Sequence, residues 1–222
     1  MPNLDLSILQ IMYGDTPVEK IMQGDTLIWP PVYDAQVEYL ETDGTACINT
    51  LFRPDNNTSI EAEYSKGDTG TLIICGARTA KNSKDYTVFP NNGTSFLVRF
   101  GNRENTFNYT FVTDHVYRVT SNKRVFTVYD VTADTSVNSM TCTSSTFSCS
   151  YYMYLFALNT AGTVTVYPQK IYYFKLYDNG TLIRDYIPVR KNGVGYMYDK
   201  VTGELYGNVA GSGAFSYGSD VT

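Results

Sequence analysis

Hydrophobic and polar residues alternate over short segments through most of the chain. The alternation is clear in Ile60–Tyr64, Phe96–Phe100 and Val116–Val119, and each segment predicts a strand with one buried face. Turn-forming residues recur about every eight to twelve positions, a rhythm typical of β-sandwiches and barrels. Helical periodicity is absent. The pattern therefore predicts an all-β protein with no helix longer than one turn.

Two hairpins are predicted near the C-terminus. Lys170–Tyr177 and Thr181–Val189 flank Asp178–Gly180, and these three residue types readily adopt positive φ angles in tight turns. A second tight turn, at Val201–Gly203, joins the next two short strands. These segments give the clearest local signals in the sequence.

The first thirty residues contain a short repeat. Tyr13–Val18 recurs ten residues later as Gln23–Ile28, with a Gly-Asp pair in each copy. The repeat predicts a small β-meander with strands at about Ile8–Tyr13, Val18–Met22 and Leu27–Trp29. Because such a short unit buries little surface alone, we expect it to dock on a partner chain or on the main domain.

Pro30 and Pro31 interrupt the strand pattern, because proline cannot donate to a sheet ladder. We therefore predict a domain boundary at this point. Residues 1–31 would form an N-terminal docking module, and residues 32–222 would form a β-sandwich.

Composition narrows the possible partners. The 222 residues include 20 Tyr and 11 Phe, and aromatic side chains suit the pleated faces of sheets. With 17 Lys and Arg against 22 Asp and Glu, the net charge of −5 argues against nucleic acid as a partner. The sequence shows no signal peptide and no apolar run of the roughly 20 residues that a membrane span requires. We expect a soluble product of the cytoplasm, with no membrane partner.

The four cysteines, Cys47, Cys75, Cys142 and Cys149, have neither the spacing of a zinc site nor the density of a disulfide framework. We expect them to be reduced. Cys142 and Cys149 are the only pair close enough in sequence to suggest a disulfide, and that alternative stays open.

Parts of the chain resemble a known family. Val37–Thr50 resembles the first strands of concanavalin A-like domains of the laminin-G type, and Lys175–Lys200 resembles their closing strands, together with Leu205–Asn208 and Gly211–Gly213. The N-terminal repeat, ending in Leu27–Pro30, resembles a module found near the ends of phage tail and fibre proteins. The resemblance implies a jelly-roll of two antiparallel sheets on a virion, with a carbohydrate-binding or docking role and often no catalysis.

Catalytic chemistry finds little support in the sequence. The single histidine, His115, lies near a turn and matches no catalytic motif. Glu61 and Glu63 share one strand face, at a spacing near that of the carboxyl pair in a retaining glycoside hydrolase. Enzymes similar to this family carry three alternating acids, whereas Ser59 and Ser65 flank the pair here. A solvated polar face is the favoured interpretation.

Glycan binding requires an exposed aromatic ring beside planar polar groups. Arg, Asn and Tyr cluster in three predicted loop regions, residues 76–86, 90–93 and 100–105. Tyr is also an ordinary residue of strand faces, so no single Tyr is diagnostic. Our predicted ligand-binding residues are Arg78, Tyr86, Asn92, Asn102 and Arg103.

No cofactor is predicted, but calcium is a possible ligand, since many laminin-G-like domains bind it in their rim loops. Asp68, with Asn102 or Asp130, could supply oxygen ligands. A short Gly-Asp turn explains Asp68 equally well, and no EF-hand spacing is present. Calcium therefore stays an open alternative.

The combined prediction is a non-enzymatic structural protein of a bacteriophage virion, in a head or tail fibre or decoration. Its sandwich would bind host-surface or mucus glycans, and residues 1–31 would bind other virion proteins. We expect a homo-oligomer, because multiple copies strengthen weak sugar binding. The alternatives are a purely architectural decoration protein that binds no sugar and, third, a polysaccharide hydrolase.

Overall fold

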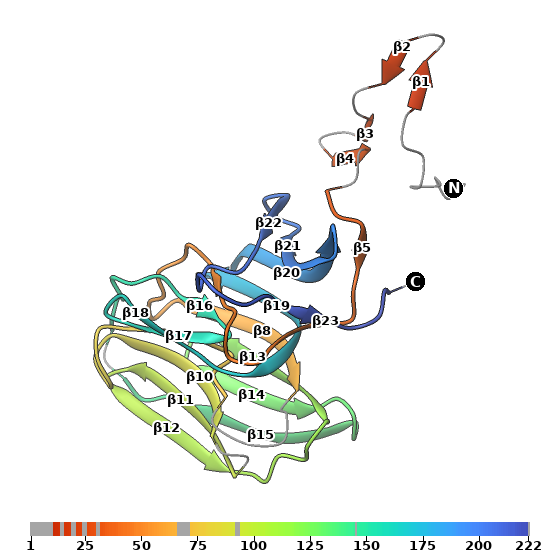
Figure 1. Cartoon of the computed structure of the whole chain (residues 1–222). Helices are drawn as coiled ribbons and strands as arrows, with labels where there is room; N and C mark the ends of the chain where they lie inside the picture. The colour runs from red at the N-terminus through yellow and green to blue at the C-terminus, as the bar shows by residue number, and fades with distance from the viewer. Residues whose placement is uncertain are drawn as a thin grey trace.

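The computed structural model describes the backbone of residues 11–13, 16–18, 21–23 and 26–29, and the chain over residues 32–65, 72–91, 94–144 and 146–221. All regular structure in these residues is β-strand, and most of it lies in two packed sheets (Figure 1). The described residues contain no helix that is long and apolar enough to cross a membrane.

The smaller sheet has the strand order β12-β11-β10-β9-β16-β7, with β17 and β18 joined to it at β9. All its pairings are antiparallel except the short parallel contact between β17 and β9. Its strands are β7 (Ile48–Asn49), β9 (Cys75–Arg78), β10 (Asp85–Asn91), β11 (Ser95–Gly101), β12 (Arg103–Asn108), β16 (Tyr154–Leu155), β17 (Ala157–Thr160) and β18 (Thr163–Val166).

The larger sheet has the order β15-β14-β13-β8-β19-β20-β21-β22, with β6 and β5 beside β19 and β20, and β23 beside β6. The chain crosses between the two sheets repeatedly, as in a jelly-roll. The strands are β5 (Ala35–Gln36), β6 (Leu40–Thr42), β8 (Thr58–Ser65), β13 (Val116–Asn122), β14 (Val125–Asp130), β15 (Thr135–Thr141), β19 (Gln169–Asp178), β20 (Thr181–Lys191), β21 (Val194–Asp199), β22 (Glu204–Tyr206) and β23 (Ser216–Tyr217).

Aromatic rings fill the space between the sheets. Tyr86 and Phe100 of the smaller sheet meet Phe126 of the larger sheet, with ring centroids 6.3 and 6.4 Å from it. Alternation explains which side chains point inward, because successive residues of a strand face opposite sides. On β8, Tyr64 is fully buried while its neighbour Glu63 faces outward. The predicted fold class, an all-β sandwich of two antiparallel sheets, is confirmed.

The two C-terminal hairpins are also confirmed. β19 and β20 pair across a tight turn in which Asn179 and Gly180 have φ angles of 47° and 85°. β21 and β22 pair across a turn in which Gly203 has a φ angle of 76°. Asn and Gly adopt such angles at low cost, which is why turn chemistry alone located both hairpins.

The N-terminal segment differs from the predicted meander. Its strands are β1 (Ile11–Tyr13), β2 (Thr16–Val18), β3 (Ile21–Gln23) and β4 (Thr26–Trp29). In the described residues β1 pairs with β2 and β3 pairs with β4, as two separate hairpins. The prediction of one middle strand at 18–22 is therefore wrong, because β2 ends at Val18 and β3, which begins at Ile21, belongs to the other hairpin. The Gly-Asp pairs and the proposed boundary at residues 30–31 lie outside the described residues, so the boundary stays a prediction.

The sandwich has two different ends. The chain enters and leaves at what we call the terminal end, where Arg190 of β20 donates two hydrogen bonds to the Asp220 carboxylate, at 2.8 and 2.7 Å. The opposite end, the loop end, is held together by backbone hydrogen bonds such as Asn179 N–H to Asn57 O, at 3.2 Å. The loop end comprises residues 52–57, 79–84, 101–103, 122–124, 142–144, 146–153 and 178–181.

Candidate functional site

The outward face of the larger sheet carries a ladder of ion pairs. Arg118 donates hydrogen bonds to Glu63 Oε1 from Nε and Nη2, at 2.9 and 2.6 Å. Glu61 Oε1 accepts from Tyr173 Oη at 2.9 Å and from Lys175 Nζ at 3.2 Å. Each glutamate is thus held by a cation from a neighbouring strand, as expected for opposite charges across a strand pair.

A hollow of about 320 Å³ opens on this face near the loop end. Sheet register brings its parts together, because Glu61 of β8 lies opposite Thr120 of β13, and Ser59 lies opposite Tyr177 of β19. We call it the tyrosine pocket. Its lining residues are Ser59, Ile60, Glu61, Thr120, Ser121, Asn122, Tyr177 and Gly180.

Two polar groups in the tyrosine pocket are available to a ligand. Glu61 uses Oε1 to bind Tyr173 and Lys175, and within the described residues its Oε2 has no hydrogen-bond partner. The exposed amide of Asn122 likewise has no partner among the described side chains and backbone. The half-buried ring of Tyr177 completes the lining. A fixed carboxylate, a free amide and an aromatic ring suit the hydroxyls and apolar face of a sugar.

The neighbours of Glu61 hold its side chain in place. Burial, together with the hydrogen bond to Glu61, raises the pKa of Tyr173, so its hydroxyl stays a proton donor. Partial burial disfavours the charged form of Lys175, but its hydrogen bond and attraction to Glu61 outweigh this and raise its pKa. Both residues therefore orient the carboxylate at neutral pH.

The same geometry argues against hydrolysis by Glu61 and Glu63. A retaining hydrolase needs one carboxyl to act as an acid, whereas both carboxylates here accept hydrogen bonds from cations. His115 Nδ1 lies 2.9 Å from the buried carboxylate of Asp130, which holds the ring in a structural pair. The solvated polar face that we favoured for Glu61 and Glu63 agrees with these contacts.

The cysteines lack the properties of nucleophiles. All four are free thiols and all are buried. Burial raises the pKa of Cys47 to about 11 and that of Cys142 to about 12, so both remain protonated at neutral pH.

A second hollow, of about 270 Å³, lies on the other side of the turn between β13 and β14, and we call it the rim pocket. Asn122 lines the tyrosine pocket, and the next residue, Lys123, lines the rim pocket. Lys123 Nζ also donates to Asn179 Oδ1 at 3.1 Å, which ties the two neighbouring turns together. The lining residues of the rim pocket are Asn56, Asn57, Phe100, Lys123, Arg124, Ser144 and Thr146.

Two of the predicted binding residues lie beside the rim pocket. Asn102 donates its backbone N–H to Ser144 Oγ at 3.1 Å, and the Ser144 hydroxyl donates back to Asn102 Oδ1 at 3.2 Å. Arg103 follows it and is exposed. Arg78 lies on the outward face of the smaller sheet, where its Nε donates to Thr160 Oγ1 at 2.9 Å and its guanidinium lies 3.7 Å from Asp85.

The prediction for Tyr86 is contradicted by its burial. Tyr86 is 0% exposed, because strand alternation points it inward with Val88, and a ring packed between the sheets cannot offer its face to a sugar. That prediction was wrong. Asn92 lies outside the described residues.

Asn122 and Tyr177 were not predicted from the sequence, and both lie at strand ends beside turns. Their only local signal was an Asn and a Tyr next to tight turns. The two residues can be assigned to one site only once β13, which carries Asn122, and β19, which carries Tyr177, are known to flank β8.

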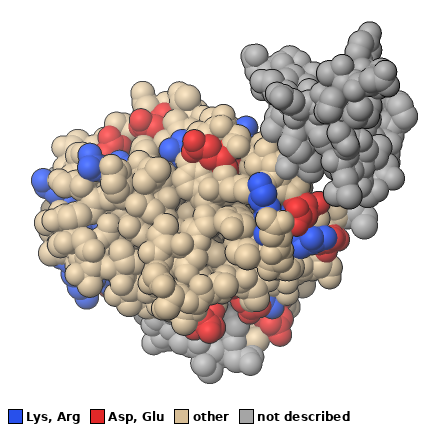
Figure 2. All heavy atoms as spheres, turned by 45° about the horizontal axis from the view of Figure 1, so that its top comes forward, with Lys and Arg blue, Asp and Glu red and all other residues tan. Residues whose placement is uncertain are grey.

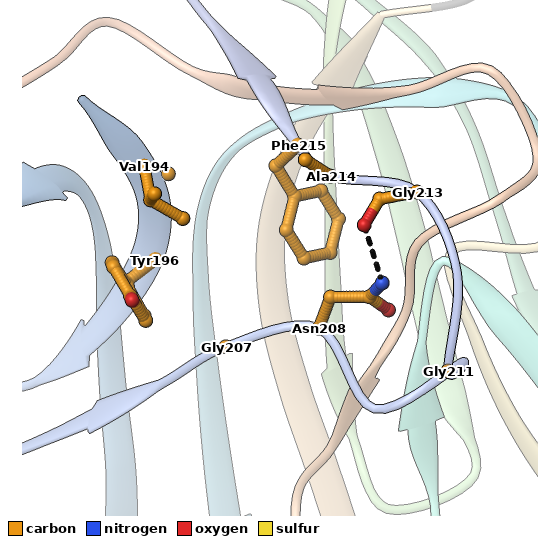
Figure 3. Close-up of a pocket in the computed structure, with 9 residues that line it drawn as sticks. Val194, Tyr196, Gly207, Asn208, Gly211, Gly213, Ala214 and Phe215 are labelled. Atoms are coloured by element: carbon orange, nitrogen blue, oxygen red, sulfur yellow. Dashed lines mark hydrogen bonds between the residues drawn. The ribbon is translucent and has the colours of Figure 1, made fainter.

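A third hollow, of about 320 Å³, lies near the C-terminus and is lined partly by glycine (Figure 3). Its central polar residue is Asn208, whose Oδ1 accepts from Cys47 N–H and Ala210 N–H at 3.0 and 2.8 Å. Asn208 Nδ2 donates to the carbonyls of Ser212 and Gly213, each at 3.1 Å. The amide is therefore fully used in holding the C-terminal loop, and we assign the hollow a structural role.

The predicted calcium ligands are not brought together. Asn102 lies at the loop end beside Ser144, whereas Asp130 lies at the far end of β14 beside His115. Asp68 is outside the described residues. Across the described part of the chain, no three His, Cys, Asp or Glu side chains form a group that could hold a metal ion.

Comparisons with known proteins find no match in sequence and only a limited similarity in structure. No protein-family model matches the sequence, and no match was found among curated proteins. In a solved structure, the CBM40 of the Ruminococcus gnavus IT-sialidase bound to α2,3-sialyllactose is similar with a TM-score of 0.45 and 10% identity, over 65% of this chain and 92% of that one. A second structure of this CBM40 gives a TM-score of 0.44 and 10% identity, over 64% and 90%.

Proposed function

We propose that this protein is a non-catalytic carbohydrate-binding β-sandwich and that the tyrosine pocket is its glycan site. The observation that carries the proposal is the meeting of the Tyr177 ring, the Glu61 Oε2 and the Asn122 amide around one hollow, the last two having no hydrogen-bond partner among the described residues. Its volume of about 320 Å³ lies at the lower end of the range for ligand sites, about 300–1,000 Å³. Such a site suits one or two sugar units.

A shallow site of this size binds a single sugar weakly. Display of several copies on one particle would convert weak single-site binding into useful avidity, since linked sites raise the overall affinity by about 10²–10⁴. This reasoning supports a homo-oligomeric or multiply attached protein.

The test is glycan-array binding of the full-length protein, followed by calorimetry with the glycan that binds best. We expect Tyr177→Ala and Asn122→Ala each to weaken binding at least about tenfold, a change of about 1.4 kcal/mol. Tyr129→Ala is the matched control, because Tyr129 lies on the same sheet but bonds Asp134 near the terminal end and lines neither pocket. Equal affinities for all four proteins would reject the tyrosine pocket as the site.

The same measurement addresses the alternatives. Failure of the full-length protein to bind any glycan, even when it is multimerised, would favour an architectural role. Release of reducing sugar by the protein, abolished by Glu61→Gln, would instead establish a hydrolase.

We further propose that residues 1–31 dock the sandwich on a bacteriophage particle, where it contacts host-surface or mucus glycans. The support for this proposal is the resemblance of the Gly-Asp-Thr repeat to modules of phage tail and fibre proteins. Mass spectrometry of purified particles should find the protein, and deletion of residues 1–31 should remove it from them. Its absence from particles would reject the virion assignment.

A further inference from the structure

The cations of the sandwich fall into two groups. Most described lysines and arginines have a carboxylate within 4.0 Å, as Arg118 has Glu63 and Arg190 has Asp220. The remaining described cations have no described carboxylate within that distance. They are Arg53, Lys84, Arg103, Lys123, Arg124 and Lys191.

All of these unpaired cations except Lys191 lie at the loop end. Arg103 follows Asn102 in the β11–β12 turn, and Asn102 bonds Ser144 of the rim pocket. Lys123 and Arg124 themselves line the rim pocket. All five are exposed, and Arg53 also lies over the Tyr152 ring, with 4.6 Å between the guanidinium carbon and the ring centroid.

The carboxylates of the loop end are largely occupied. Asp55 accepts the N–H of Asn57 at 2.7 Å and its side-chain amide at 3.4 Å. Glu104 is held by Arg99 and Lys81. Asp85, at the start of β10, lies 3.7 Å from Arg78, and Asp178 is a further, exposed acid among the described turns of this end.

The loop end is thus locally positive, although the whole chain carries a charge of −5. Figure 2 shows Lys and Arg atoms gathered along the left margin of that view. Unpaired cations around a hollow attract anions, and the attraction weakens with salt because exposed charges are screened.

We infer that the glycan is acidic and that the loop end binds its carboxylate or sulfate groups through Lys123 and Arg124 at the rim pocket. This inference rests on the proposed function. The two pockets share the turn between β13 and β14, so one saccharide chain can place a neutral unit against Tyr177 and an acidic unit in the rim pocket. Asn56 and Thr146 add uncharged polar groups to the rim pocket.

The distribution of charge favours an acidic glycan over a nucleic acid. Nucleic acids require a dense basic stripe along the backbone, whereas this chain is acidic overall and only two of its unpaired described cations, Lys123 and Arg124, line the rim pocket. Single-stranded DNA therefore serves as a competing probe.

The experiment uses the full-length protein and a glycan array of matched pairs, in which each neutral saccharide is also present in a sulfated or uronic acid form. We expect acidic members to bind at least about tenfold tighter at 50 mM NaCl, with the preference falling at 500 mM. The double variant Lys123→Glu with Arg124→Glu should lose that preference and keep binding to neutral members. Lys191→Glu, which reverses the unpaired cation of the terminal end, should change both affinities less than about twofold.

The outcomes separate the two proposals. Equal binding of neutral and acidic members, sensitive to Tyr177→Ala, would keep the glycan site and overturn the acidic preference. Binding to no member would overturn both. Single-stranded DNA bound as tightly as the acidic members, with the same loss in the double variant, would overturn the assignment to glycans. Should the double variant unfold, Lys123→Gln with Arg124→Gln provides the milder comparison, read by circular dichroism and binding together.

Discussion

The two ends of the sandwich use the same kinds of side chains for different purposes. At the terminal end, Arg190 binds Asp220 through two hydrogen bonds and lies 3.7 Å from Asp34, so one cation joins the first and last parts of the domain. At the loop end, Lys123 and Arg124 line a hollow and have no described acidic partner. The pairing state of a charge therefore distinguishes side chains that hold the fold from those left available to a ligand.

The largest expected change is a loss of stability when Asn208, near the terminal end, is replaced. Asn208→Ala removes four hydrogen bonds that hold the C-terminal loop, and it leaves backbone groups of Cys47 and Gly213 without those partners. We expect the free energy of unfolding to fall by about 2–4 kcal/mol, measured by urea denaturation. Asn122→Ala at the loop end, whose amide has no described partner, should change it by less than about 0.5 kcal/mol. Similar losses for the two variants would break the distinction between the ends.

A pH titration sharpens the comparison. Burial favours the neutral form of Asp130, but hydrogen bonds from His115 and the Ala133 N–H outweigh it, and the pKa of Asp130 lies below its ordinary value. Its stabilisation is therefore present above the unfolded pKa, about 3.9, and is lost as the pH falls through the lower folded value. Asp130→Asn should cost about 1–3 kcal/mol at pH 7 and flatten the acid limb of stability, as followed by urea denaturation.

Asp85, at the loop end, serves as the control, because its pKa is shifted in the opposite direction. Burial raises the pKa of Asp85, although bonds from Thr87 and the charge of Arg78 act against it. The folded state then binds a proton more tightly, so this group's contribution to stability falls as the pH rises through the window above about 3.9. Asp85→Asn should remove this decrease of stability with rising pH, measured by urea denaturation at several pH values. A steeper decrease in the variant would contradict the raised pKa of Asp85.

The smallest expected effect concerns Tyr86. Its ring is buried, and its hydroxyl makes one long contact, 3.5 Å from Ser121 Oγ. Tyr86→Phe should lower the free energy of unfolding by less than about 1 kcal/mol and leave glycan affinity unchanged, in calorimetry against the same glycan. A loss of affinity as large as that of Tyr177→Ala would place the site at the smaller sheet instead.

The sequence by itself determined the local features of this protein. Alternation along β8 separated Ile60 and Tyr64 from Glu61 and Glu63, because neighbouring strand residues must face opposite sides. The Asn179–Gly180 turn located the longest hairpin, because few residue types accept its backbone angles. These features depend on residues close together in the chain, so a single sequence contains them.

Only the tertiary structure decided which distant segments meet. Strand order placed β8 between β13 and β19, and that order brought Glu61, Asn122 and Tyr177 to one hollow. It also buried Tyr86, which the sequence had suggested for a loop site. Alternation defines two faces for each strand, but which face is covered depends on the opposing sheet, and that packing joins residues far apart along the chain.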